Sequence, residues 1–464
     1  MENVREIILD TLLTMERDKV LSHELIRSVL DKYDYLDIRE KAFIKRVTEG
    51  VIERRIELDY DLDALSSVPV KKMKPLIRCL LRMSVYQILY MDGIPDSAVC
   101  NEACKLAGKR KFQNLKGFVN GILRSVSRQK DHMPLPDAEN EPVRYLSVKY
   151  SMPEMIVNSF REDYGQDLTE SLLKSLLDTH PVSLRMTNAA GTTDDLKREL
   201  EAAGFRASVS KYSDSVLLVH GGDAIKNLGS FRDGRVTVQD ISSLLAVKAA
   251  GIREGDLVID ACAAPGGKSI VASEMTGSGG RVICGDVSEQ KLMKIRENIE
   301  RIGADNIEVR LWDARSLPKE LEGKADVLIL DIPCSGYGVM GKKRDIKYHV
   351  TSEGLAELTE LQAGILHEAW KAVKPGGILL YSTCTIRFAE NRGMVKRILE
   401  ELPFEPVDIM EFIPQDVRMA VQEEKKANNH LLDPDAETCC AQLLPGLMDA
   451  DGFFFAKFRR KKNA

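Results

Sequence analysis

The stretch Val258-Ile259-Asp260-Ala261-Cys262-Ala263-Ala264-Pro265-Gly266-Gly267-Lys268-Ser269 decides the fold of the C-terminal half of the chain. Its apolar start predicts a buried strand, its small residues predict a tight turn, and a helical pattern follows. Small residues let a ligand approach the backbone, and the first turn of a helix presents N–H groups that lack partners. In open α/β sheets ligands bind at the carboxyl ends of the strands, so this turn is a candidate binding site.

Further apolar strands alternate with helical patterns on the C-terminal side of this stretch. The strand candidates are residues 256–260, 281–286, 307–310, 325–331 and 377–383. Strands that are apolar throughout and separated by helices predict a parallel sheet with both faces covered. We therefore predict an α/β, Rossmann-like domain with a doubly wound, mostly parallel sheet over residues 236–464.

The rest of the chain divides into two further segments. Apolar residues recur at helical spacing up to about residue 130, so an all-α domain is predicted over residues 1–134. A polar stretch with three prolines, residues 129–142, is a plausible linker. Strand, helix and strand patterns follow, which predict a small α+β domain over residues 143–235.

Composition bounds the class of protein and its environment. The 464 residues are 44% hydrophobic, which excludes a disordered chain and a small disulfide scaffold. The N-terminus has no signal-peptide core, and no run of 18 apolar residues occurs, so no membrane span is expected. The nine cysteines are an odd number, typical of reduced thiols. We expect a cytoplasmic protein, a monomer, with no bound metal, because Cys100 and Cys104 lack a second ligand pair.

Charge distribution is more informative than net charge. The chain has 66 Lys and Arg against 71 Asp and Glu, a net charge of -5, which by itself argues against a nucleic-acid partner. Yet residues 105–130 contain eight basic residues and no acidic one, and residues 71–82 contain five more basic residues. Clusters of this kind bind phosphates, so we predict an RNA partner.

Two aspartates follow the strands after the opening turn and narrow the choice of cofactor. Asp286 ends one strand, where a carboxylate can accept both hydroxyls of a ribose, and Asp313 follows the next strand, where it can accept an adenine amine. A dinucleotide would require G-x-G-x-x-G, and a phosphate-binding loop would require glycine where Cys262 stands. S-adenosylmethionine fits best. Its predicted binding residues are Cys262, Ala263, Ala264, Pro265, Gly266, Gly267, Lys268, Asp286, Asp313 and Asp331.

Two cysteines each follow a predicted strand on the edge that carries this turn. Cys334 stands in Asp331-Ile332-Pro333-Cys334-Ser335-Gly336, and Cys384 stands in Ser382-Thr383-Cys384-Thr385. A thiol beside a methyl donor suits methylation at C5 of a pyrimidine, because a thiolate that adds to C6 makes C5 nucleophilic. The target base would have to leave its stack to reach the site.

These motifs also carry a resemblance to a known family. Residues 236–459 resemble the 5-methylcytosine RNA methyltransferases of the Nol1/Nop2/Sun class. The matching pieces are Gln239-Asp240, Cys262 to Lys268, Asp286, Asp313, Asp331 to Gly336, Ser382-Thr383-Cys384 and Asp451-Gly452-Phe453-Phe454. The family's Arg-Arg-x-Pro-Asp segment is represented by residues 342–347, which lack the proline.

The resemblance implies roles for four residues. Cys384 would be the nucleophile and Cys334 would assist release of the product. Asp331 would contact the cytosine beside the cofactor, and Lys268 would lie at the catalytic centre. DNA cytosine methyltransferases use the cysteine of the Pro-Cys motif as nucleophile, so Cys334 in that role remains an alternative. Asp331 or a water molecule would remove the C5 proton.

The N-terminal half resembles RNA-binding modules. Residues 1 to about 130, most clearly 118–124, resemble a NusB-like domain, and residues 143–235 resemble a small RNA-recognition-like domain. The whole arrangement is similar to a bacterial class of 16S rRNA cytosine-C5 methyltransferases, which implies 16S rRNA as substrate. The alternatives are a tRNA or 23S rRNA substrate, and a non-catalytic NusB-like RNA-binding module on a degenerate scaffold.

Overall fold

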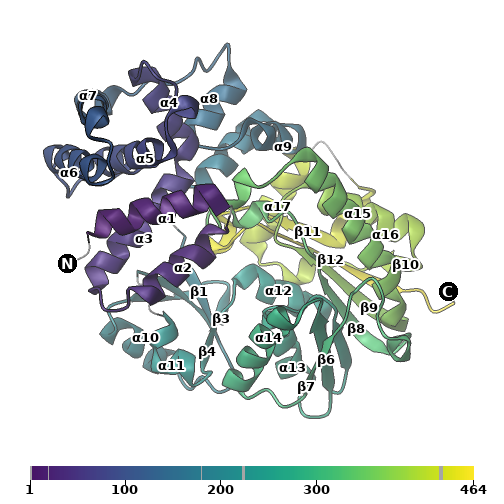
Figure 1. Ribbon diagram of the computed structural model, residues 1–464. Helices are drawn as coiled ribbons and strands as arrows, with labels where there is room; N and C mark the ends of the chain where they lie inside the picture. The colour runs from purple at the N-terminus through teal and green to yellow at the C-terminus, as the bar shows by residue number, and fades with distance from the viewer. Residues whose placement is uncertain (1–2, 19, 179, 222–224, 428–431, 464) are drawn as a thin grey trace. The chain divides into compact units, whose positions relative to one another are not determined.

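A computed structural model describes residues 3–18, 20–178, 180–221, 225–427 and 432–463 (Figure 1). The chain forms two compact units. Unit 1 comprises residues 1–161, 169–177 and 342–349, and unit 2 comprises residues 162–168, 178–341 and 350–464. The predicted domain boundaries at residues 134, 143 and 235 stay predictions.

Unit 1 is helical, as the periodicity predicts. Its helices are α1 (Val4–Asp18), α2 (Ser22–Lys32), α3 (Ile38–Glu53), α4 (Arg55–Leu65), α5 (Pro75–Tyr90), α6 (Asp96–Lys109), α7 (Lys116–Gln129), α8 (Pro142–Lys149) and most of α9 (Glu154–Ser175). Short 3-10 turns η1 (Val70–Lys72), η2 (Gln113–Leu115) and η3 (Lys130–His132) connect some of them.

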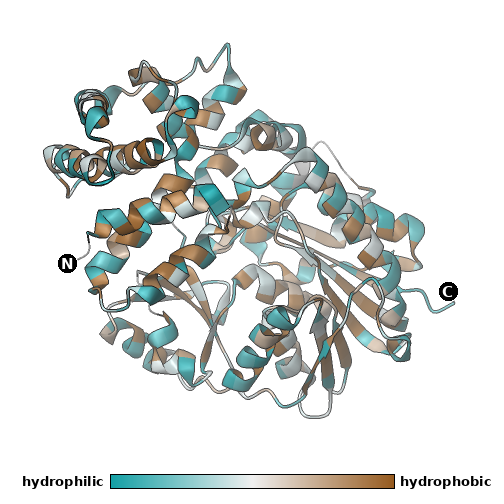
Figure 2. Cartoon of the chain, viewed as in Figure 1, coloured by the Kyte–Doolittle hydropathy of each residue, from teal (hydrophilic) through white to brown (hydrophobic). Residues whose placement is uncertain are grey.

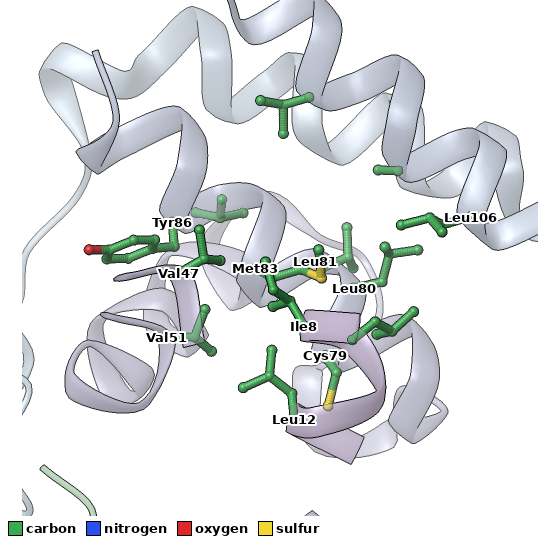
Figure 3. Packing of buried hydrophobic residues seen from close by; sticks show 14 of the residues in the cluster. Ile8, Leu12, Val47, Val51, Cys79, Leu80, Leu81, Met83, Tyr86 and Leu106 are labelled. Atoms are coloured by element: carbon green, nitrogen blue, oxygen red, sulfur yellow. The ribbon is translucent and has the colours of Figure 1, made fainter. Parts of the chain in front are cut away.

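Local signals set the helix starts, and one shared core holds the helices together. Asp37 and Glu40 form a reciprocal capping box at the start of α3, which satisfies two backbone N–H groups. Pro75 stands in the first turn of α5, where its missing N–H costs nothing. Figure 3 shows buried side chains from α1, α3, α5 and α6 gathered in one apolar cluster. Burying that surface is the main driving force for folding of this unit.

A strap of eight residues, 342–349, belongs to unit 1 although it lies within the predicted methyltransferase sequence. It includes the 3-10 turn η7 (Ile346–Tyr348). Its contacts pair Arg344 with Glu49 and Glu53, place Asp345 2.6 Å from the N–H of Ser22, and join Tyr348 to the carbonyl of Ile52 at 2.8 Å. The side chain of Lys347 is buried and donates to the carbonyls of Glu53 and Ser151 at 2.7 Å each.

Unit 2 contains two sheets. The smaller one is antiparallel with the order β2-β3-β1-β4, built from β1 (Val182–Met186), β2 (Arg206–Ser210), β3 (Ser213–His220) and β4 (Val236–Val238). Helices α10 (Thr193–Ala202) and α11 (Gly229–Arg232) accompany it. Residues of its strands and helices share an apolar core that includes Leu184, Leu196 and Leu217.

The larger sheet has the order β10-β12-β9-β8-β5-β6-β7, with β11 paired to β12. Its strands are β5 (Leu257–Asp260), β6 (Arg281–Asp286), β7 (Ile307–Leu311), β8 (Ala325–Asp331), β9 (Val373–Thr383), β10 (Phe404–Pro406), β11 (Cys440–Leu443) and β12 (Phe453–Arg460). Strands β5 to β9 pair in parallel, whereas β12 pairs antiparallel with β9, β10 and β11. The predicted mostly parallel sheet is confirmed.

Helices cover this sheet on both faces. They are α12 (Ile241–Ala250), α13 (Gly267–Thr276), α14 (Glu289–Ile302), α15 (Ser352–Ala369), α16 (Arg392–Glu401), α17 (Gln415–Ala427) and α18 (Pro434–Thr438). Successive residues of β5 enter different cores, since Val258 packs in one cluster and Ile259 in the other. Figure 2 shows hydrophobic colouring along these strands. In the part of the chain that is described, no helix is long and apolar enough to cross a membrane.

The strap gives a prediction about pH. Burial lowers the pKa of Lys347 to about 7, whereas an unfolded lysine has a pKa of about 10.4. Between these values the unfolded chain holds a proton that the folded chain lacks, so the free energy of unfolding should rise with pH by up to about 1.4 kcal/mol per pH unit. Below pH 7 this lysine contributes no slope. Lys347→Met should remove the added slope in urea denaturation between pH 7 and 10.

The control is Lys72→Met, which alters an exposed lysine of the same unit. It should keep the wild-type slope. If the free energy of unfolding rises with pH equally for wild type and Lys347→Met, the lowered pKa of Lys347 is wrong.

Candidate functional site

The register of two neighbouring strands brings the two cysteine motifs together. Strands β8 and β9 run parallel, and Asp331 at the end of β8 lies opposite Ser382 on β9. Each cysteine follows its strand by a short loop, so both loops leave the same edge of the sheet. The backbone N–H of Ile332 donates to the carbonyl of Ser382 at 3.1 Å, which extends the pairing past the strand end.

The cysteine thiols are in contact. The Sγ atoms of Cys334 and Cys384 lie 3.2 Å apart, and the N–H of Gly338 donates to the carbonyl of Cys384 at 3.0 Å. The hydrogen bond with Cys384, together with burial, raises the pKa of Cys334 well above that of an ordinary thiol. Either sulfur can donate the hydrogen bond that joins them.

An ion pair lies beside the thiols. Lys268 Nζ is 2.7 Å from one carboxylate oxygen of Asp331, and the hydroxyl of Ser382 donates to the other at 2.8 Å. Lys268 is 8% exposed and also lies 5.0 Å from the centre of the Phe453 ring. A buried ammonium of this kind is stabilised by its carboxylate partner and by the ring face. Lys268 and Asp331, predicted from separate motifs, thus meet in one site.

The turn after β5 is held against the end of β6. Gly266 has a φ of +101°, a backbone conformation that favours glycine. The N–H of Ala264 donates to the Asp286 carboxylate at 3.2 Å, and the N–H of Ala263 donates to the carbonyl of Gly285 at 2.9 Å. Asp286 also accepts from Lys291 Nζ at 2.8 Å. Burial raises the pKa of the Cys262 thiol, so this third cysteine of the region remains a neutral thiol.

The hydrogen-bond acceptors at this edge of the sheet fit S-adenosylmethionine. Asp286 presents a buried carboxylate at the strand end, as a ribose acceptor requires. Asp260 is fully buried, and its Oδ1 has no hydrogen-bond partner among the described residues, while its Oδ2 accepts from Ser269 at 2.6 Å. Burial raises the pKa of Asp260 to about 7. An unsatisfied acceptor at a strand end is the feature expected where a ligand supplies the missing donor.

Asp313, which the sequence predicts to accept a hydrogen bond from the adenine amine, accepts hydrogen bonds from Arg315 in the structure. Its carboxylate accepts from the backbone N–H of Arg315 at 2.9 Å and from the Arg315 guanidinium at 2.6 Å. These hydrogen bonds lower the pKa of Asp313. Its contact with adenine stays a prediction, and Arg315 would have to share the carboxylate with the base.

Sequence reasoning did not single out three further residues of the site. Gln362, Glu390 and Asn391 are buried and hydrogen-bonded to the two cysteine loops. Glu390 and Asn391 lie shortly after the Thr-Cys motif and directly before α16. A polar pair before a helix is usual at helix starts, so the only available signal was its closeness to Cys384.

Unit 1 neutralises much of the basic sequence that predicted RNA binding. Acidic side chains, several of them on α1, pair with basic residues of α5, of α6 and its C-terminal end, and of η3. The pairs are Arg78–Glu16, Arg82–Glu16, Arg82–Asp59, Lys105–Glu102, Lys109–Glu6, Arg110–Glu6, Arg110–Asp10 and Lys130–Asp96. A stretch of sequence without acidic residues therefore need not form an unpaired basic surface, because acidic residues from other parts of the chain pair with it in the fold.

A smaller basic patch remains. Lys71, Lys72 and Lys111 are exposed and make no ion pair among the described residues. Lys74 Nζ lies 5.4 Å from the centre of the Phe112 ring, which places the 71–74 segment beside Lys111. We call Lys71, Lys72 and Lys111 the lysine patch.

Comparisons with known proteins show which family the chain belongs to. Residues 248–459 match the family model described as 16S rRNA methyltransferase RsmB/F. Residues 2–128 match the NusB family, and residues 152–225 match the ferredoxin-like domain of RsmF/B-like methyltransferases. A Bacillus subtilis protein named "Probable ribosomal RNA small subunit methyltransferase B" is 33% identical, with 99% of each chain covered. The chain belongs to the RsmB/F family of 16S rRNA methyltransferases.

Other relatives share the name or the fold. The ribosomal RNA small subunit methyltransferase B of Serratia proteamaculans is 30% identical, with 90% of each chain covered. The solved structure of NSun6 from Pyrococcus horikoshii with SFG has a TM-score of 0.55 at 20% identity, covering 66% of this chain and 98% of that one. As an RsmB/F methyltransferase, the protein uses S-adenosylmethionine as cofactor and an RNA as substrate.

The Asp286 carboxylate gives a prediction about cofactor affinity. Asp286→Asn should weaken binding of S-adenosylmethionine by on the order of tenfold or more, because hydrogen bonds to a charged acceptor contribute about 1.5–3 kcal/mol. Isothermal titration calorimetry measures the change. The matched control is Asp256→Asn, which alters the aspartate that caps the turn before β5 through the N–H of Arg253. Equal affinity of Asp286→Asn and wild type would exclude the ribose role.

The lysine patch gives a prediction about salt. Replacing Lys71, Lys72 and Lys111 together by Gln should weaken RNA binding and reduce the slope of log affinity against log salt. Each lost phosphate contact on single-stranded RNA lowers that slope by about 0.7. Filter binding across a salt series gives the slope.

The control changes an equal number of basic residues that already have acidic partners. Replacing Lys105, Lys109 and Arg110 by Gln should alter the slope less, because Glu102, Glu6 and Asp10 neutralise them. A larger effect from this second triple variant would place the RNA on α6 instead.

Proposed function

We propose that this protein transfers a methyl group from S-adenosylmethionine to C5 of a specific cytosine in 16S rRNA, through a covalent bond between Cys384 and C6 of the base. One observation carries the proposal: the two thiols lie 3.2 Å apart beside the Lys268–Asp331 pair. The proposal places the reaction in the cytoplasm, with the chain acting as a monomer.

The chemistry explains why two thiols are useful. C5 of cytosine is a weak nucleophile. When the Cys384 thiolate adds to C6, the S–C6 bond forms and the former π electrons of C5–C6 become available at C5. The bound cofactor supplies an electrophilic methyl group to that carbon. A base then removes the C5 proton, and the electrons of that C–H bond restore the C5–C6 double bond. The S–C6 bond breaks in the same step, and its electrons leave on the Cys384 sulfur.

The resemblance to the Nol1/Nop2/Sun class favours Cys384, rather than Cys334, as the nucleophile, because in that class the cysteine of the Thr-Cys motif attacks the base. The Cys334 sulfur lies 3.2 Å from that of Cys384, and a thiol that donates a hydrogen bond stabilises a neighbouring thiolate. The same S–H group is within reach of the Cys384 sulfur when that sulfur leaves C6. Cys334 is therefore suited to assist release.

Asp331 and Lys268 complete the proposed catalytic set. Asp331 is held by Lys268 and Ser382 at the strand end, and a carboxyl there can bind the N3 edge and the exocyclic amine of the cytosine. Lys268 offsets the negative charge of that carboxyl beside the thiolate. We propose Asp331 or a water bound to it as the acceptor of the C5 proton.

The names of the relatives and the NusB-like match favour 16S rRNA over tRNA or 23S rRNA as the substrate. A non-catalytic RNA-binding module would not need adjacent thiols. The contact between Cys334 and Cys384 therefore favours an enzyme over that second candidate.

Cysteine variants test the mechanism. Cys384→Ala should form no covalent complex with RNA that contains 5-fluorocytosine, because the attacking sulfur is gone. Cys334→Ala should form the complex with ordinary RNA and release it slowly, so the adduct accumulates on denaturing gels. Cys79→Ala, which removes a buried thiol of unit 1, should behave like wild type. An adduct formed by Cys384→Ala would reverse the two roles.

The substrate is tested in cells. Bisulfite sequencing should find one 16S rRNA cytosine that loses its methyl group when the gene is deleted and regains it with the wild-type gene, but not with Cys384→Ala. Unchanged 16S rRNA together with a lost methyl group in tRNA or 23S rRNA would transfer the proposal to that RNA.

A further inference from the structure

Glu390 and Asn391 are consecutive residues buried beneath the two cysteine loops. They close the 3-10 turn η9 (Phe388–Glu390) just before α16, and their exposed fractions are 0% and 1%. Burying a carboxylate and an amide is unfavourable unless their hydrogen bonds are made inside the protein. Their partners therefore show what this burial achieves.

Asn391 holds the residues on either side of Cys384. Its Oδ1 accepts from the hydroxyl of Thr383 at 2.6 Å, and its Nδ2 donates to the carbonyl of Thr385 at 3.0 Å. The same Nδ2 donates to Gln442 Oε1 at 2.7 Å, which ties the amide to β11. One side chain thus binds the residue before Cys384 and the residue after it.

Glu390 does the same for Cys334. Its Oε2 accepts from the backbone N–H of Ser335 at 2.8 Å and from Gln362 Nε2 at 2.9 Å. That Gln362 nitrogen also donates to the carbonyl of Pro333 at 2.8 Å. The Glu390 carboxylate therefore holds the residue after Cys334 directly and the residue before it through Gln362.

Strand pairing alone does not place the cysteines. Strand β8 ends at Asp331 and β9 ends at Thr383, so both thiols lie on loops beyond the last residues of their strands. Because residues 390 and 391 are adjacent, the two loops are fastened to one rigid point. We propose that Glu390 and Asn391 are paired positioning residues, Glu390 for Cys334 and Asn391 for Cys384.

This inference rests on the proposed function and assigns a different kinetic step to each residue. Asn391 supports the attacking thiolate, so its loss slows formation of the covalent adduct. Glu390 supports the thiol that assists release, so its loss lets the adduct form and slows its decay. A misplacement of about 1 Å in a reacting group lowers rates by on the order of a hundredfold.

Two near-isosteric variants separate the steps. In Glu390→Gln the new NH2 group faces a donor in either orientation, because Arg387 donates to Oε1 at 3.0 Å while Ser335 and Gln362 donate to Oε2. In Asn391→Asp a carboxylate oxygen replaces Nδ2 and faces the carbonyl of Thr385. Each change breaks one support and keeps the side-chain volume.

The measurement is a time course of covalent RNA–protein adduct and of 5-methylcytosine, with S-adenosylmethionine and unmodified 16S rRNA. Glu390→Gln should accumulate adduct on the order of tenfold above wild type, as Cys334→Ala does. Asn391→Asp should lower kcat on the order of ten- to a hundredfold without adduct and with little change in KM for RNA.

The matched control is Glu424→Gln, the same substitution at a carboxylate that is 2% exposed. Glu424 pairs with Arg392 at 2.7 and 2.9 Å. This variant should lower stability and leave the ratio of adduct to product unchanged. If Glu390→Gln matches Glu424→Gln in that ratio, Glu390 has only a structural role and the inference is wrong.

If the Glu390 or Asn391 variant does not fold, two milder variants test the same inference. Gln362→Met removes the link to Pro333 and should accumulate adduct, and Thr383→Val removes the link to Asn391 and should slow adduct formation. If wild type makes no 5-methylcytosine, or Cys334→Ala holds no adduct, the proposed function fails. If those two behave as expected and neither the Glu390 nor the Gln362 variant accumulates adduct, only the positioning role fails.

Discussion

The contact between the Cys334 and Cys384 sulfurs is the constraint around which the catalytic unit is arranged. Its geometry requires β8 and β9 to be neighbours, parallel, and in a register that places Asp331 opposite Ser382. Its electrostatics are less favourable, because the Glu390 carboxylate faces Cys334 and the Asp331 carboxylate stands at the end of the strand that leads to it. Each of these carboxylates has its own cation, Lys268 at 2.7 Å and Arg387 at 3.0 Å. The site can therefore hold acidic groups near a thiolate without an uncompensated negative charge.

The antiparallel strand β12 closes the same site from the other side. The N–H of Gly452, just before β12, donates to the carbonyl of Gly338 in the loop after Cys334 at 2.9 Å. A Cβ built on Gly338 would lie 2.0 Å from the carbonyl oxygen of Gly452, so this approach requires glycine. Phe453 then supplies the ring beneath the Lys268 ammonium. The last strand of the chain therefore supports the two motifs that form the middle of the sheet.

The strands and the motif residues could be predicted from the sequence because their signals are local. A short apolar run such as 325–331, bounded by polar and turn residues, is typical of a buried strand, and the small residues around Gly266 favour a tight turn. Partnerships between distant residues could not be predicted in this way. Glu390 is 55 residues from Ser335 along the chain, and no periodicity relates them. The strap at 342–349 was assigned to the methyltransferase sequence, yet the buried Lys347 and the Arg344 pairs place it with the helices of unit 1.

The charge of unit 1 shows the same limit and has a consequence for RNA binding. Residues 105–130 lack acidic residues, but Glu6 and Asp10 of α1 neutralise Lys109 and Arg110. A lysine or arginine that is already paired with an acidic side chain contributes less to phosphate binding and to the release of counterions from RNA. The electrostatic affinity of this unit for RNA must therefore be smaller than its lysine and arginine content suggests. A weak, sequence-independent attraction leaves selection of the RNA to contacts other than those with its phosphates. An enzyme that selects one RNA among many gains from that division, because tight phosphate binding would retain every RNA equally.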